Sequence, residues 1–179
     1  MQTDVFLKST ADQMHKLIFK VERLVGMADE ETINKMPTPD AWSIGQILDH
    51  LNKGLDYYLP GMRSGMAGKP KGAAQAEVKH SWFGRMIVKG IGPGGHAPVL
   101  RQLLPGNGPY KKDIVSTWTR RHEEIIHLTE QARGIDLSAV NIRNPFFKFV
   151  QMNLADFFAI LIAHAEGHIA QIEERMNIK

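Results

Sequence analysis

The chain has 179 residues, of which 43% are hydrophobic and 23% are charged, proportions that are ordinary for a water-soluble globular protein. Its formal net charge is only +3, so charge alone indicates no nucleic-acid partner. The chain has no cysteine, which excludes disulfides and thiolate metal ligands. A transition-metal site would therefore use histidine, carboxylate or water.

The length predicts one domain that covers residues 1–179. Residues 1–8 contain no basic flank followed by an apolar run, so we expect no secretory signal peptide. The longest apolar run, at residues 157–163, is much shorter than the roughly 20 residues that span a bilayer. These observations predict a cytoplasmic protein with no membrane partner.

Two amphipathic helices are predicted in the first third of the chain. Residues 4–28 place apolar side chains at the i, i+3, i+4, i+7 spacing of a helix with one buried face. A second helix is expected to begin at Ser43, because Ser43 and Gln46 have the spacing of a capping box. Its apolar face includes His50, and Trp42 is expected to act as a hydrophobic staple or as an anchor for the preceding link.

The segment from about residue 60 to residue 109 has a different composition. Glycine and proline recur along it, and Glu77 is its only carboxylate. A connection of this length inside a domain is more often functional than not. We predict a long crossover that covers one end of the domain and contains a short helix at residues 81–88.

Two further helices are predicted in the second half of the chain. One covers residues 112–132, with Gly134 as its stop, and the other covers residues 152–176. Residues 143–149 are typical of a short extended segment, but no partner strand is predicted for them. Four helices with one long crossover between the second and the third predict an all-α fold, a four-helix bundle.

Three histidines are expected on the inward faces of these helices. His164 and His168 are four residues apart, so both project from the same apolar face of the last helix, and His50 lies near the middle of the second. Three imidazoles can bind a divalent metal and leave coordination positions open. The alternative is that each is a neutral core histidine with a satisfied hydrogen bond. Gln171 continues this face, either to orient a bound water or substrate or as a polar contact at the end of the bundle.

The other five histidines are given no metal role. His122 lies alone on an apolar stripe and is interpreted as a satisfied core residue. His15, His80, His96 and His127 are expected at the surface or in loops. If the metal interpretation fails, His96, beside two glycines, is the next loop residue to consider.

Two motifs in this sequence resemble those of the DinB-like bundles. Residues 42–51 (WSIGQILDHL) are similar to the signature of their second helix, and residues 164–171 (HAEGHIAQ) are similar to the H-x-x-x-H-x-x-Q signature of their fourth. The resemblance implies a site for a divalent metal, zinc or nickel, with His50, His164 and His168 as the ligands. It also implies dimers and, for some relatives, thiol-dependent transferase or isomerase activity with bacillithiol, mycothiol or glutathione. The long crossover departs from this pattern.

The leading hypothesis is a metal-dependent enzyme that acts on a small-molecule substrate, as a transferase using a low-molecular-weight thiol or as a hydrolase. No catalytic side chain is identified. One alternative is a non-catalytic module for metal binding or dimerisation, and another is a small-ligand binder whose histidines contact the ligand directly. We also expect a homodimer.

Overall fold

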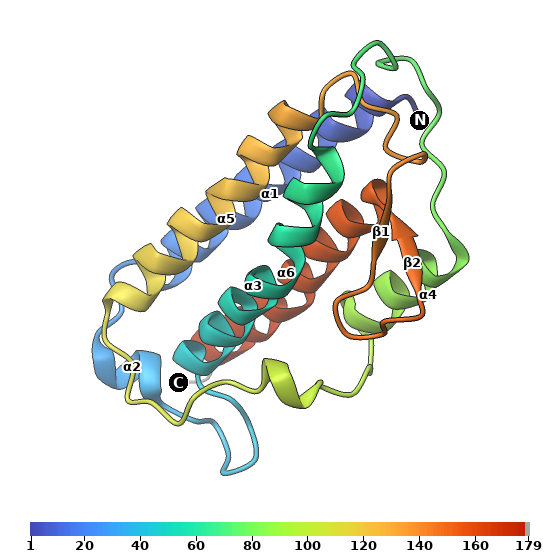
Figure 1. Ribbon diagram of the computed structural model, residues 1–179. Helices are drawn as coiled ribbons and strands as arrows, with labels where there is room; N and C mark the ends of the chain where they lie inside the picture. Colours follow the sequence, from blue (N-terminus) through green and yellow to red (C-terminus); the bar gives the residue numbers. More distant parts are fainter. Residues whose placement is uncertain (178–179) are drawn as a thin grey trace.

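The computed structural model describes residues 1–177, and its four long helices run alongside one another (Figure 1). α1 and α3 each pack against both α5 and α6, so the order around the bundle is α1, α5, α3, α6. The predicted all-α four-helix bundle is confirmed. Residues 178 and 179 of the predicted domain lie outside the described range. The long helices are α1 (Thr3–Val25), α3 (Ile44–Met66), α5 (Asp113–Ala132) and α6 (Leu154–Asn177).

Burial of apolar side chains explains why these segments form helices that pack together. α6 is buried along most of its length, with Phe157 and Phe158 among the largest fully buried side chains. Each such side chain contributes about 1.5–3 kcal/mol when it leaves water. No helix within residues 1–177 is long and apolar enough to cross a membrane.

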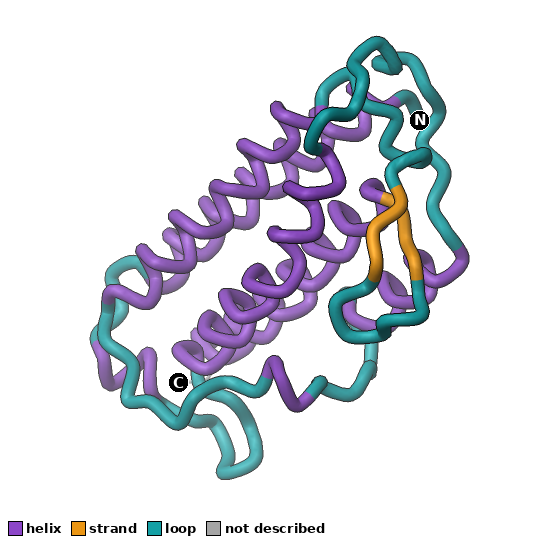
Figure 2. The backbone as a smooth tube through the Cα atoms, in the orientation of Figure 1, coloured by secondary structure: helices purple, strands orange, loops and turns teal. Residues whose placement is uncertain are grey.

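Shorter elements connect the long helices (Figure 2). The short helix expected at residues 81–88 is present as α4. It packs against α6, outside the four-helix bundle. The shorter elements are α2 (Glu30–Asn34), α4 (Trp82–Ile91), the 3₁₀ helix η1 (Arg101–Leu103), β1 (Asn141–Arg143) and β2 (Gln151–Asn153).

The start of α3 agrees with the prediction, and its end does not. The capping box is present: the Ser43 hydroxyl accepts from the Gln46 amide at 3.2 Å, and the Gln46 side chain accepts from the Ser43 amide at 2.9 Å. The crossover was predicted to begin at Pro60, but α3 continues through this proline to Met66. Met62 and Met66, beyond the proline, are buried in the core, and this packing outweighs the loss of one helical hydrogen bond.

The crossover was predicted to cover one end of the domain. In the structure it runs along the bundle from one end to the other. Near the start of α1, the Thr3 amide donates to the Ala76 carbonyl. At the opposite end, the Gly106 amide donates to the Asp49 side chain near the start of α3. Figure 1 shows the chain passing between these ends through α4 and η1.

Residues 143–149 were predicted as an extended segment without a partner strand, but only Arg143 lies in a paired strand, and the other residues form the loop between β1 and β2. β1 and β2 form an antiparallel pair in which Ile142 lies opposite Met152. Both side chains are buried, whereas a three-residue strand is too short to show a clear apolar alternation in the sequence. The loop between the strands is held by Asn144, whose side-chain oxygen accepts from the Phe146 and Phe147 amides.

A buried carboxylate fastens α4 to the start of α6. Asp156 is completely buried, and its oxygens accept from the Ser81 amide at 3.1 and 3.3 Å and from the Asn153 amide at 3.1 Å. His80 was expected at the surface or in a loop. It does lie in the loop before α4, but it is half-buried, and its Nδ1 is 3.0 Å from Asp156 Oδ1.

Candidate metal centre

Three histidines from two neighbouring helices meet inside the bundle. His50 lies in the second turn of α3, and His164 and His168 lie one turn apart on α6. One ring nitrogen from each histidine lies within 4.8 Å of the others. His50 and His164 are 2% and 8% exposed, and His168 is half-buried. The structure therefore brings together the three residues that the sequence had singled out.

The hydrogen bond of His50 fixes which of its nitrogens faces the cluster. Its Nδ1 lies 2.7 Å from the carbonyl oxygen of Leu103, in η1. A carbonyl oxygen only accepts, so Nδ1 donates and Nε2 presents a lone pair. Nε2 in turn lies 2.8 Å from Nε2 of His164. The ring of His50 is thus held with its basic nitrogen toward α6.

Gln171 fixes the ring of His168 as the Leu103 carbonyl fixes that of His50. Its side-chain oxygen Oε1 accepts from Nδ1 of His168 at 3.1 Å, which leaves the lone pair of His168 on Nε2. From its place in the sequence, Gln171 was expected to orient a bound water or substrate, or to make a polar contact at the end of the bundle. In the structure it orients one of the three imidazoles.

Trp42 forms an aromatic wall beside the cluster. Its ring centroid lies 4.9 Å from that of His50 and 6.0 Å from that of His168, with the latter pair stacked. The sequence suggested a staple or an anchor for this residue, and its contact with the histidines was missed. The position of Trp42 directly before the cap of the helix that carries His50 is the signal that could have indicated it.

The end of the crossover supports the cluster through Asp49. The Asp49 carboxylate accepts from the Gly106 amide at 2.8 Å and from the Tyr110 hydroxyl at 3.0 Å, and Lys53 lies 3.1 Å away. Burial alone would raise the pKa of Asp49, but these hydrogen bonds lower it below its usual value. They fasten the segment that supplies the Leu103 carbonyl to α3. Sequence patterns gave no sign of this support.

Burial keeps the three imidazoles neutral. Loss of hydration lowers the pKa of His50, and it lowers the pKa of His164 well below its usual value, with the neighbouring His168 and His50 adding to the effect. The pKa of His168 falls to about 4, chiefly through burial and then through the charge of His50. Neutral imidazoles keep the lone pairs that a metal ion requires.

The donor set fits a divalent transition metal. Two nitrogens that are each 2.0–2.1 Å from one ion lie about 3.0–3.4 Å from each other. The Nε2 atoms of His50 and His164 are 2.8 Å apart, and the ring nitrogens of all three histidines lie within 4.8 Å of one another. Small ring movements would bring all three nitrogens to the spacing that one ion requires. Hydrogen-bond acceptors on the second ring nitrogens of His50 and His168 are typical of metal-binding histidines.

Comparison with protein families identifies the fold family of this bundle. The sequence matches the model of the DinB superfamily over residues 13–172. The chain belongs to the DinB superfamily. The resemblance seen in residues 42–51 and 164–171 is thereby confirmed. Comparison with curated proteins found no match.

A solved structure shares the architecture of this DinB-superfamily chain. YfiT from Bacillus subtilis, described as a probable metal-dependent hydrolase with an unusual four-helix bundle topology, is similar with a TM-score of 0.61. The sequences are 11% identical, and the match covers 94% of this chain and 85% of YfiT. At this identity the likeness shows the fold alone.

The remaining histidines of this DinB-superfamily chain lie outside the cluster. His122 is buried on α5, its Nδ1 donates to the Trp118 carbonyl at 2.9 Å, and its ring stacks on that of Trp118, as a satisfied core residue should. His15, His96 and His127 are exposed, as predicted. Within residues 1–177, the trio on α3 and α6 is the one group of three or more histidines or carboxylates placed to hold a metal ion.

Proposed function

We propose that this protein is a metal-dependent enzyme in which His50, His164 and His168 bind one divalent ion, zinc or nickel. The observation that carries the proposal is the convergence of three neutral imidazoles from α3 and α6 on one point. The hydrogen bonds of His50 and His168 support it, because they turn the basic nitrogens of both rings toward the cluster. Membership of the DinB superfamily agrees with it.

Three protein ligands leave at least one coordination position for a small molecule. An ion held in this way lowers the pKa of a bound water or thiol and so supplies a nucleophile near neutral pH. The reaction is therefore a transfer to or from a low-molecular-weight thiol, or a hydrolysis. The description of YfiT as a probable metal-dependent hydrolase favours keeping hydrolysis beside thiol transfer.

The residues of this chain bind and orient, and none is assigned as a general base. His50 is held by Leu103 and His168 by Gln171, while Trp42 limits access from one side. The nearest carboxylate along α3, Asp49, is occupied by Gly106, Tyr110 and Lys53 and is not free to accept a proton from a substrate.

The competing function is a metal brace between α3 and α6, with no catalysis. The two helices are already packed against each other, and a shared ion would fix them further. A brace and an enzyme differ in the open coordination position. The homodimer expected from the sequence is a separate prediction, which sedimentation of the purified protein would test.

Cobalt substitution separates the enzyme from the brace. We expect cobalt bound by the three histidines to give a visible spectrum that changes when an uncharged thiol, β-mercaptoethanol, is added, because thiolate binding alters the ligand field. The His122→Leu variant is the control, since His122 is buried outside the cluster, and it should respond like the wild type. A cobalt spectrum that no thiol alters, with a large fall in melting temperature on metal removal, would favour the brace.

A further inference from the structure

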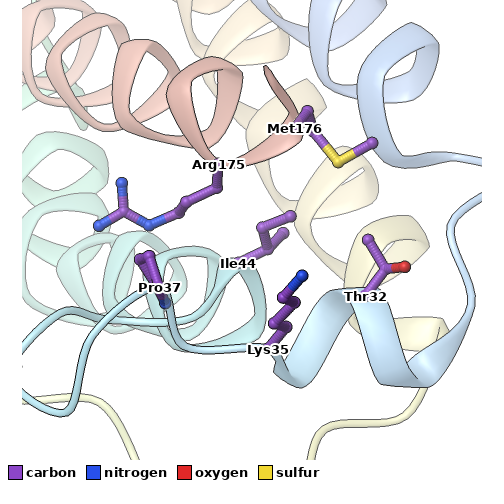
Figure 3. A pocket seen from close by; sticks show the side chains of 6 residues that line it. All are labelled: Thr32, Lys35, Pro37, Ile44, Arg175 and Met176. Carbon is purple, nitrogen blue, oxygen red and sulfur yellow. The ribbon is translucent and has the colours of Figure 1, made fainter. Parts of the chain in front are cut away.

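A pocket lies at the end of the bundle where α6 finishes. Its volume is about 150 Å³, enough for a small functional group. Figure 3 shows its walls, which come from α2 and the following loop, from the start of α3 and from the last turn of α6. Among residues 1–177, the lining contains two cationic side chains and no carboxylate: Thr32, Lys35, Pro37, Ile44, Arg175 and Met176.

Within residues 1–177, Arg175 is held in place by hydrogen bonds and forms no salt bridge. Its Nε donates to the Trp42 carbonyl at 2.7 Å, and its Nη1 donates to the Gln171 carbonyl at 2.8 Å. Both acceptors are neutral, and among residues 1–177 no carboxylate forms a salt bridge with this guanidinium. Glu174, the adjacent acid, is exposed and does not line the pocket. The remaining N–H groups of Arg175 are available to an anion.

Lys35 supplies the second positive charge from the opposite side of the pocket. It follows α2 directly, and in Figure 3 its side chain extends toward Ile44, whereas Arg175 extends from α6 toward the side of Pro37. Lys35 forms no salt bridge within the described part of the chain. Two cations that form no salt bridge within residues 1–177 line a small cavity together with the apolar Ile44 and Met176, and this is the chemistry that recognises a carboxylate.

Trp42 and Gln171 connect Arg175, on the pocket wall, with the histidine cluster. Trp42 stacks on the His168 ring and gives its carbonyl to Arg175, and Gln171 bonds His168 through its side chain and Arg175 through its backbone. Arg175 follows His168 by seven residues, which is about 10 Å along a helix and almost two full turns, so both lie on the same face of α6.

We propose that this pocket binds a carboxylate of the substrate or thiol whose reacting atom reaches the three histidines. The inference rests on the proposed function and sharpens it, because it defines the substrate class. The molecule is anionic, and its carboxylate and its reacting atom bind on the two sides of Trp42 and Gln171.

The carboxylate pocket can be tested without metal chemistry. The Nε–H resonance of Arg175 is observed by NMR in the metal-loaded protein while glutarate, or its uncharged diamide, is added. We expect a saturable shift with glutarate alone, and an affinity that falls roughly two- to five-fold in Lys35→Gln. Lys148→Gln removes an exposed lysine on the β1–β2 loop and is the matched control, with no effect expected. No saturable shift with glutarate, or an equal shift with the diamide, overturns the proposal.

The link to the histidines is tested with matched thiols on cobalt-substituted protein. Glutathione and its dimethyl ester carry the same thiol, and the ester lacks the carboxylates. We expect glutathione to bind about ten-fold more tightly than the ester, and this preference to be lost in Arg175→Gln and largely kept in Arg175→Lys.

The two proposals fail in different ways. An equal affinity for glutathione and its ester, or a preference that Arg175→Gln leaves intact, overturns the link even if glutarate binds. If neither thiol alters the cobalt spectrum, the open coordination position of the proposed function fails, and the glutarate titration then decides the carboxylate pocket by itself.

Discussion

The Nε2 atoms of His50 and His164 lie 2.8 Å apart, although 114 residues separate the two histidines in the chain. Packing of α3 against α6 brings the two rings together, and the Leu103 carbonyl determines which nitrogen of His50 takes part. Two buried nitrogens at this separation either share a proton or direct their lone pairs at one ion. The presence of His168 within 4.8 Å of both favours the ion.

Replacing Gln171 with leucine should weaken metal binding and leave the fold intact. The substitution removes the acceptor for Nδ1 of His168, while the backbone carbonyl that binds Arg175 is kept. Loss of such a hydrogen bond to a metal ligand lowers metal affinity roughly 10- to 100-fold. Competition with a chromophoric chelator measures the affinity.

The matched control for Gln171→Leu is Glu166→Gln. Glu166 is half-buried on the same helix, close in sequence to His164 and His168, and it forms no salt bridge with any of residues 1–177. Its substitution should leave the metal affinity unchanged. Equal affinities for wild type, Gln171→Leu and Glu166→Gln would contradict the role given to Gln171.

Replacing Gly84 with alanine should destabilise the protein through Asp156. A Cβ at Gly84 would overlap the carboxyl carbon of Asp156, which is completely buried and bonded on both oxygens. Overpacking of this kind costs about 1–3 kcal/mol, which urea unfolding would measure. Gly90→Ala, on the same helix, meets only the Ala97 methyl group at 3.4 Å and should be neutral or slightly stabilising. Similar stabilities of the two variants would argue against the close contact.

His122 should make the protein less stable as the pH falls. Burial lowers the pKa of His122 to about 3, so below about pH 6.5 the unfolded chain binds a proton that the folded protein does not. Its contribution to the free energy of unfolding therefore decreases by up to about 1.4 kcal/mol per pH unit between about pH 6 and pH 4. In His122→Leu the dependence of unfolding on pH should become shallower by this amount. Equal slopes in urea unfolding of the two proteins would contradict the prediction.

The long helices were predictable because their cause is local. Apolar spacing defined α1 and α5 to within a few residues, and the Ser43–Gln46 capping box marked the start of α3. The errors arose where distant contacts decide the structure. Pro60 remains helical because the next turns pack into the core, and β1 and β2 pair because Ile142 and Met152 are buried together.

The three histidines of the candidate site were predictable from the sequence, but the groups that hold and surround their rings were not. Two histidines one turn apart on an apolar face, with a third on another apolar face, are visible in the sequence. The Leu103 carbonyl and the Trp42 ring reach the cluster only through tertiary packing. The same holds for Asp156, whose partners His80 and Ser81 come from the crossover.

Metal stoichiometry of the purified, untagged protein tests the central claim most directly. We expect about one divalent ion per chain in the wild type and in His122→Leu, and its loss when His50, His164 or His168 is replaced by alanine. Elemental analysis after equilibration with zinc or nickel gives the answer. A wild-type protein that is folded yet retains no ion, or alanine variants that bind it as tightly as the wild type, would contradict the account.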